Sequence, residues 1–163
     1  MRRRVIAAAA VALVAGAACE VGCGGGTDGH LRVERLAKRA TTLMDEPAYA
    51  DYCPADSILS ILAIAPNRAG GLAVRTAFPL REPRTFRVQP LLDSLGTATA
   101  AFRPMTGWAL LGTSGQIRLE RGRTVQGEFQ VAVAESAGTV VQLRGTFSRI
   151  PVRGDPPLTC PRR

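Results

Sequence analysis

The stretch GEFQVAVAESAGTVVQLRGTF, residues 127–147, begins and ends with the same Gly-x-Phe unit. Apolar and polar residues alternate on both sides of Ser136-Ala137-Gly138, which predicts two strands joined by a three-residue loop, with Gly138 in the left-handed conformation. The register that follows pairs Val133 with Val141, Val131 with Leu143, Phe129 with Gly145 and Gly127 with Phe147. Each phenylalanine ring therefore faces a glycine and covers the backbone that the glycine leaves bare.

The other face of this hairpin is polar. It presents six side chains suited to water, namely Glu128, Gln130, Gln142, Arg144, Thr146 and Ser148. After Phe147 the alternation changes phase, which predicts a bulge or the end of the sheet near Arg149. Residues 116–120 also alternate, and a turn at 121–123 returns the chain to the hairpin, so we predict a three-stranded C-terminal meander.

Upstream of the meander, four further segments have strand patterns: 57–65, 72–78, 85–89 and 96–104. The turn signal at 66–71 predicts a hairpin between the first two. Prolines flank the third segment, which predicts an edge strand. Residues 30–56 fit strands or a short helix within 30–48, and we favour strands because the remainder is β. The predicted fold is all-β, a single antiparallel β-sandwich or small barrel.

The first 18 residues have the composition of an export signal. Arg2, Arg3 and Arg4 give a positive start, an apolar run extends from Val5 to Val14, and small residues follow for cleavage. The whole apolar stretch, from Val5 to Ala18, is shorter than the ~20 residues needed to span a bilayer, although an uncleaved anchor helix stays an alternative. Glycine-rich residues 19–29 predict a flexible tether, and 30–163 a single β-rich domain.

Cys19 lies at the end of this signal. The run Gly16-Ala17-Ala18-Cys19 resembles the lipobox of bacterial lipoproteins, whose cysteine receives a diacylglycerol, but Gly16 stands where that pattern has an aliphatic residue. Cleavage after Ala17 without lipidation is the alternative. With the Gly-x-Phe hairpin, the signal resembles those of uncharacterised exported β-rich bacterial lipoproteins. The resemblance implies a β fold and an envelope location, in the periplasm or on the outer surface, but no activity.

The composition is typical of a globular protein that does not bind nucleic acid. The chain has 163 residues, of which 46% are apolar and 21% charged, enough for one domain with a core. The net charge is +8, or +5 after the signal leaves, with 18 basic residues against 13 acidic ones. The arginines are scattered among only eight aromatic residues, whereas nucleic-acid binders cluster the two kinds. A surface of this sign still attracts anionic lipid or envelope polysaccharide weakly.

The chain has four cysteines. Exported proteins meet oxidising conditions, so we predict a disulfide between Cys53 and Cys160, which would stabilise the fold by roughly 4 to 5 kcal/mol. Cys23 would be left over if Cys19 is lipidated; otherwise it would pair with Cys19 or compete for Cys53. A zinc site is not favoured, because the cysteines do not form two tight pairs and His30 is the only histidine.

No pattern in the sequence indicates catalysis or a cofactor. His30 adjoins the glycine-rich tether, where a solvated side chain is expected rather than a catalytic base. Gly-x-Ser-x-Gly and phosphate-binding glycine loops are missing from the sequence. The acidic residues Asp45, Glu46, Asp51 and Asp56 lack the spacing of a calcium loop, so we interpret them as solvated loop charges. The sequence predicts no enzyme activity, no cofactor and no metal.

Two functions are compatible with these observations. The first is an exported, non-catalytic domain, anchored by lipid or free, that binds or scaffolds a partner in the cell envelope. The second is a carrier of a small hydrophobic ligand, with a barrel cavity near Trp108. A tryptophan in this position otherwise closes one end of a core. An apolar internal cavity would favour the carrier, and a filled core would favour the interaction domain.

Overall fold

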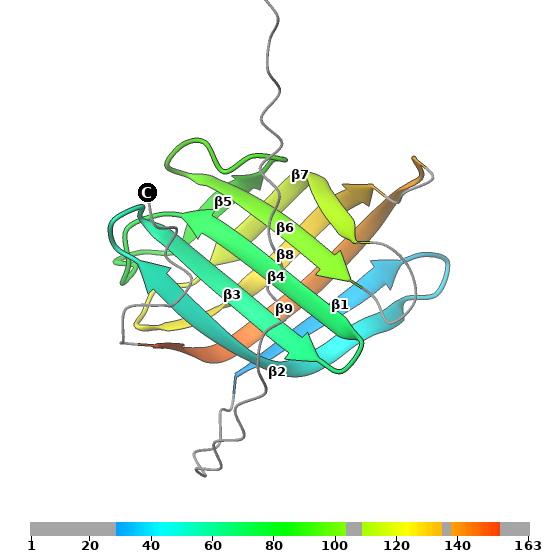
Figure 1. Cartoon of the computed structure of the whole chain (residues 1–163), viewed down its shortest axis with the longest axis horizontal. Coiled ribbons are helices and arrows are strands. Elements are labelled where there is room, and N and C mark those ends of the chain that lie inside the picture. The colour runs from blue at the N-terminus through cyan, green and yellow to red at the C-terminus, as the bar shows by residue number, and fades with distance from the viewer. Residues whose placement is uncertain (1–28, 104–108, 135–137, 154–163) are drawn as a thin grey trace, which may run out of the picture.

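The computed structural model describes residues 29–103, 109–134 and 138–153. Nine strands account for most of these residues, and none of the described residues is helical (Figure 1). The strands are β1 (His30–Leu36), β2 (Thr41–Cys53), β3 (Ile58–Ala65), β4 (Arg68–Arg75), β5 (Arg84–Val88), β6 (Thr97–Arg103), β7 (Leu110–Leu119), β8 (Thr124–Ala134) and β9 (Val140–Arg153). The all-β prediction is confirmed.

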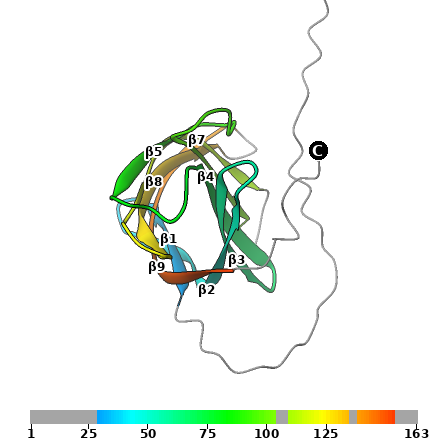
Figure 2. The same ribbon diagram turned by 90° about the vertical axis from the view of Figure 1, so that its left-hand side faces the viewer.

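The nine strands form one sheet that closes on itself. Their order is β1-β2-β3-β4-β6-β5-β7-β8-β9, and β9 pairs again with β1, so that the strands surround a common interior (Figure 2). This order corresponds to the barrel alternative and not to a sandwich of two sheets. Most neighbours are antiparallel, but β5 pairs with β6 and the end of β9 pairs with β2 in parallel. The sheet is therefore mixed, which corrects the prediction of a purely antiparallel one.

The N-terminal region contains strands only. The alternative of a short helix within 30–48 is wrong, because β1 and most of β2 occupy that range. In β1, buried Leu31 and Val33 alternate with residues that face outward. This period of two is the strand pattern that the sequence also allowed for this range.

Two details of β4 and β5 differ from the prediction. β5 is not an edge strand, because it pairs with β7 on one side and β6 on the other. Its flanking prolines mark where the strand begins and ends. The turn between β3 and β4 is short, with Asn67 at φ 67°, so Gly70 and Gly71 lie within β4. A Cβ at Gly70 would lie 3.0 Å from Met44 Sδ, which explains why the strand carries a glycine there.

The hairpin of β8 and β9 has the predicted register. All four predicted pairs are present, namely Val133 with Val141, Val131 with Leu143, Phe129 with Gly145 and Gly127 with Phe147. Gly138 has φ 79°, the left-handed conformation expected for it, whereas residues 135–137 lie outside the described residues. The pairing of β7 with β8 completes the predicted meander.

The phase change after Phe147 is a bulge. Phe147 pairs with Gly127 and Ile150 pairs with Val125, so two residues of β9 lie opposite one residue of β8. Arg149, one of the two, has φ 48°. The extra residue returns Ile150 to the interior, where it is fully buried, and β9 continues to Arg153. The alternative that the sheet ends here is wrong.

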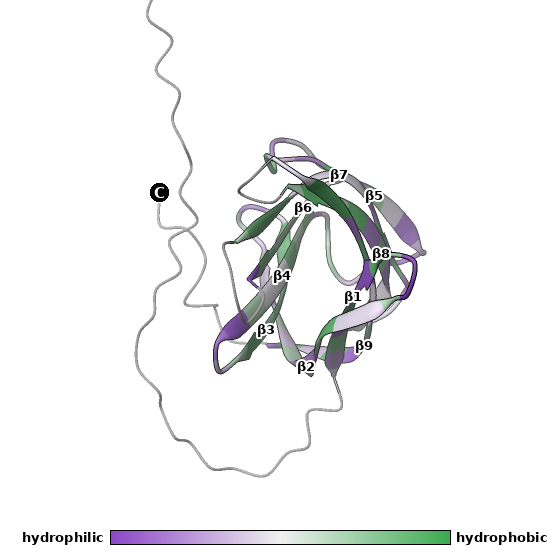
Figure 3. Ribbon diagram, turned by 90° about the vertical axis from the view of Figure 1, so that its right-hand side faces the viewer, coloured by the Kyte–Doolittle hydropathy of each residue, from purple (hydrophilic) through white to green (hydrophobic). Residues whose placement is uncertain are grey.

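The interior of the closed sheet is filled by apolar side chains. The rings of Phe102, Phe129 and Phe147 are stacked in sequence, with centroids 5.7 and 6.5 Å apart, and Phe86 is 1% exposed. Figure 3 shows hydrophobic residues along much of β4 and β6 and hydrophilic residues gathered at several strand ends. No helix in the described part of the chain has the length and hydropathy needed to cross a membrane.

Candidate functional site

Polar side chains from five adjacent strands form two rows on the outer face of the sheet. The first row follows the register from Arg32 on β1 through Thr146, Glu128 and Arg118 to Thr85 on β5. The second row runs from Glu34 on β1 through Arg144 and Gln130 to Gln116 on β7. The two rows are neighbours because outward positions on a strand are two residues apart.

An apolar row on the inner face fixes this arrangement. Between the two polar rows, the same strands direct Val33, Gly145, Phe129, Ile117 and Phe86 into the core. All five are buried. Because burial of this row sets the register, a slip by one residue would bring the polar rows inward and is strongly disfavoured. The core thus positions the polar surface.

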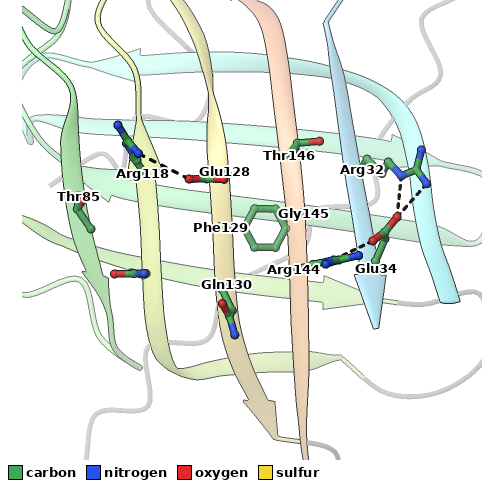
Figure 4. Close-up of a pocket in the computed structure, with 11 residues that line it drawn as sticks. Arg32, Glu34, Thr85, Arg118, Glu128, Phe129, Gln130, Arg144, Gly145 and Thr146 are labelled. Atoms are coloured by element: carbon green, nitrogen blue, oxygen red, sulfur yellow. Dashed lines mark hydrogen bonds and ion pairs between the residues drawn. The ribbon is translucent and has the colours of Figure 1, made fainter. Parts of the chain in front are cut away.

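The two rows line an open groove of about 740 Å³. We call it the polar groove; it is lined by Arg32, Glu34, Thr85, Gln116, Arg118, Glu128, Phe129, Gln130, Arg144, Gly145 and Thr146 (Figure 4). This volume lies in the range of about 300–1,000 Å³ typical of ligand sites, but the lining is mainly polar, whereas most small-molecule sites are mainly apolar. A groove of this kind suits a hydrophilic ligand.

Glu34 is held by two arginines at the β1 side of the groove. Arg32 donates from Nε and Nη2 to Oε1, at 3.1 and 2.8 Å, and Arg144 donates from Nε to Oε2 at 3.0 Å. The Glu34 side chain is only 17% exposed, whereas the Arg144 side chain is 56% exposed. The carboxylate therefore lies beneath the guanidinium groups and fixes their orientation.

These hydrogen bonds lower the pKa of Glu34. The bond from Arg144 is the largest cause and the bond from Arg32 the second, and burial opposes them. Glu34 therefore stays ionised at neutral pH, and both arginines keep their partner.

A second ion pair lies further along the groove and is looser. Arg118 Nη1 and a Glu128 oxygen are 3.9 Å apart, and both side chains are more than half exposed. Exposed pairs of this kind contribute little to stability, so each partner is free to turn toward a ligand. Thr85, Gln116, Gln130 and Thr146 add exposed hydroxyl and amide groups between the charges.

The acidic residues considered as metal ligands do not meet. Asp45, Glu46 and Asp51 belong to strand β2 rather than to a loop, which corrects the prediction of loop charges. Asp45 Oδ1 lies 3.5 Å from Nδ1 of the exposed His30, whereas Glu46 Oε1 lies 3.1 Å from Arg68 Nε. Within the described residues, no group of three or more His, Cys, Asp or Glu side chains is arranged to hold a metal ion.

The predicted disulfide and lipidation sites fall partly outside the described residues. Cys53 is 5% exposed and ends β2. Cys160, its predicted partner, and Cys19, the predicted lipidation site, lie outside the described residues. Both assignments stay predictions.

The carrier hypothesis predicts a ligand-sized cavity near Trp108, next to the described residues 109–134. Trp108 lies outside them. Close to it in sequence, Leu110 lines a cavity of only about 10 Å³, together with Val33, Leu43, Met44, Phe102 and Arg103. A cavity of this volume holds about one water molecule.

The groove was only partly recognisable from the sequence. The outward direction of Glu128, Gln130, Arg144 and Thr146 was predicted from the hairpin, and the structure confirms that they are exposed. Arg32 and Glu34 join them because β1 pairs with β9, a contact between residues 110 positions apart in the chain. Arginines that are scattered in the sequence are thus gathered on one surface. Only the strand order would have revealed this.

Comparison with known proteins found no matching family model, no similar curated protein and no similar solved structure.

Proposed function

We propose that the protein is a non-catalytic binding domain of the bacterial cell envelope, which holds its partner in the polar groove. Export and the envelope location rest on the signal-like N-terminus, with or without a lipid anchor at Cys19. The observation that carries the binding function is the groove itself, an open space of about 740 Å³ lined by polar side chains from five strands.

The filled interior supports a function on the outer surface. Large side chains such as Phe86, Phe147 and Leu31 are at most 1% exposed and occupy the space that a carrier would keep for its ligand. The cavity beside Leu110, at about 10 Å³, is far below the several hundred Å³ of a typical ligand site. A carrier function near Trp108 is therefore the less favoured proposal.

The two carboxylates of the groove suit binding better than proton transfer. Glu34 is kept ionised by Arg144 and Arg32, whereas a general acid at neutral pH needs a raised pKa. Glu128 is exposed and lies beside Arg118. We assign Glu34 a positioning role, in which it orders the two arginines for contact with a partner.

Blocking the groove tests this function. Gln130 is exposed near the middle of the groove, so Gln130→Trp would fill the space without disturbing the core. The matched control is Arg103→Trp, an exposed position on β6 outside the groove. Soluble polysaccharide and lipid vesicles from the host envelope would be applied to each immobilised protein, and binding measured by interferometry.

We expect the native protein and Arg103→Trp to bind the same envelope component to the same extent, and Gln130→Trp to lose most of the binding signal. Equal binding by all three proteins would place the contact surface elsewhere and contradict the proposal. Thermal melting of each variant would verify that the fold is intact.

A further inference from the structure

We propose that the polar groove binds an acidic glycan, a sugar polymer that carries carboxylate or phosphate groups. This inference rests on the proposed function, because it names the ligand chemistry of the same groove. Three observations carry it: the arrangement of the arginines, the exposed amides and hydroxyls between them, and the lack of an exposed aromatic ring in the groove lining.

Two of the three arginines, Arg144 and Arg118, keep donors for a ligand, whereas Arg32 is bound to Glu34 and its Nη1 lies 3.9 Å from Asp45 Oδ2. Arg144 uses Nε for Glu34, so its two terminal nitrogens remain for a second acceptor. Arg118 is 59% exposed and only loosely paired with Glu128. With Arg32, the groove has three guanidinium groups and two carboxylates, hence a net charge of +1. Guanidinium groups bind carboxylate and phosphate oxygens through paired hydrogen bonds, which are among the strongest available on a protein surface.

The uncharged lining matches the hydroxyl groups of a sugar. Gln116 and Gln130 are adjacent on β7 and β8 and present an amide donor and acceptor each. Thr85 and Thr146 add hydroxyls at other points along the groove. Such groups lie beside the arginines in both rows, so a ligand that carries hydroxyls as well as charged groups would satisfy both kinds.

The groove offers no ring on which a base or a neutral sugar would stack. Phe129, the one aromatic lining residue, is 3% exposed and packs in the core. Nucleic-acid sites gain much of their affinity from stacking on exposed rings. Without such a ring, binding here depends on charge-assisted hydrogen bonds, which favours an anionic glycan over a neutral one.

The extent of the groove suits a polymer rather than a small anion. The first row crosses five strands, β5-β7-β8-β9-β1, and neighbouring strands lie about 4.8 Å apart, so this row extends over about 19 Å. A polymer lying across the strands would contact Arg32, Arg144 and Arg118 in turn. A single free phosphate or carboxylate would not extend from Arg32 on β1 to Arg118 on β7, which lie three strand spacings apart.

The test is a calorimetric titration of the host-processed protein with four probes of similar length. The probes are a galacturonate oligomer, a phosphomannan fragment, a neutral dextran oligomer and poly-glutamate. Arg144→Gln and Arg118→Gln each remove one guanidinium group from the groove, and Arg103→Gln makes the same change outside it. The first two probes separate carboxylate from phosphate as the preferred group.

We expect at least one acidic glycan to bind, with an affinity that falls as salt is added. Each groove variant should weaken binding about tenfold, as for loss of a charge-assisted hydrogen bond, and Arg103→Gln should leave it unchanged. Equal binding of dextran, blocked by Gln130→Trp, would overturn the acidic-glycan inference but leave the groove as the binding surface. Tighter binding of poly-glutamate would replace the glycan by an acidic peptide. If none of the four probes bound, the inference would fall, whereas the proposed function would fail only if Gln130→Trp also left envelope binding intact.

Discussion

Gly145 connects the core to the polar groove. It separates Arg144 and Thr146, which point outward, and its own Cα lies beneath the ring of Phe129. A Cβ at this position would overlap the carbonyl oxygen of Arg32 and the Phe129 ring. The absence of a side chain therefore allows β1, β8 and β9 to approach closely. This close approach sets the positions of Arg144 and Thr146, the outward residues on either side of Gly145.

We expect Gly145→Ala to lower the free energy of unfolding by about 1 to 3 kcal/mol, because backbone and ring must shift to admit the methyl group. The control is Gly71→Ala on β4, where the added Cβ would lie 2.9 Å from the mobile end of Leu62. Urea denaturation would measure both variants. An equal effect at the two sites would contradict the close packing at Gly145.

The ionisation of Glu34 predicts a dependence of stability on pH. Its pKa is lowered in the folded state, so its contribution to stability is present above the ordinary pKa of 4.5 and is lost as the pH falls through the folded-state value. Glu34→Gln removes the carboxylate charge. The melting temperature of the native protein should exceed that of the variant near pH 7, and the difference should shrink below about pH 4.5. A difference that stayed constant down to pH 2 would contradict the assignment.

At the scale of the strands, the hairpin of β8 and β9 forms because local and long-range signals agree. The alternating pattern, the glycine of the loop and the two glycine–phenylalanine pairs all require the same register, which the structure has. Gly138 contributes its left-handed backbone, at φ 79°. This conformation costs other residues about 1–2 kcal/mol, and least for asparagine.

Gly138→Val should therefore destabilise the protein by about 1 to 2 kcal/mol, whereas Gly138→Asn should cost less. A side chain at Gly138 would meet no described atom within 4 Å, so crowding does not complicate the comparison. Chemical denaturation of the two variants would give both values. Equal stabilities for valine and asparagine would show that the backbone conformation is not the determining factor.

The sequence patterns predicted where the strands lie more accurately than they predicted which strands pair with one another. β3, β5, β6 and the meander were recognisable because apolar residues alternate within each. The prolines beside β5 suggested an edge strand. They lie outside Arg84–Val88, however, so every residue of the strand keeps its backbone N–H group, and β5 pairs on both sides. Glycines 70 and 71 suggested a longer turn, although both lie within β4, where Met44 packs against Gly70. Local chemistry does not distinguish these cases.

At the scale of the whole molecule, closure of the sheet creates the groove. The pairing of β1 with β9 brings Arg32 and Glu34 beside Arg144 and Thr146. Four of the groove residues could be assigned to an outer face from the hairpin alone. The meeting of five strands could not, because strand order depends on contacts between distant parts of the chain. The site is thus a property of the closed fold.

The end of β9 bears on the predicted disulfide. Arg153 pairs in parallel with Asp51, and its guanidinium carbon lies 3.9 Å from the centre of the Tyr49 ring. Cys53 follows Asp51 by two residues at the end of β2, and β2 and β9 run in the same direction there. Cys160 follows Arg153 by seven residues, which span at most about 25 Å, so the proposed bond is within reach of the chain.

Cys53→Ser is expected to lower the melting temperature strongly, because the crosslink would contribute roughly 4 to 5 kcal/mol. Cys160→Ser should have the same effect, and the double variant should be no less stable than either single one. Non-reducing peptide mapping would identify the linked pair directly. An unchanged melting temperature for both single variants would reject the pairing.

Mapping of amide chemical shifts tests most directly whether the outer polar groove of the closed β-sheet is the binding surface. The isotope-labelled protein would be titrated with the galacturonate oligomer or the phosphomannan fragment, whichever binds more tightly. We expect the largest shifts on residues 32–34, 116–118, 128–130 and 144–146, the four strand segments that contain most of the groove lining. Shifts concentrated instead on β3, β4 and β6, or no shifts at saturating ligand, would contradict this expectation.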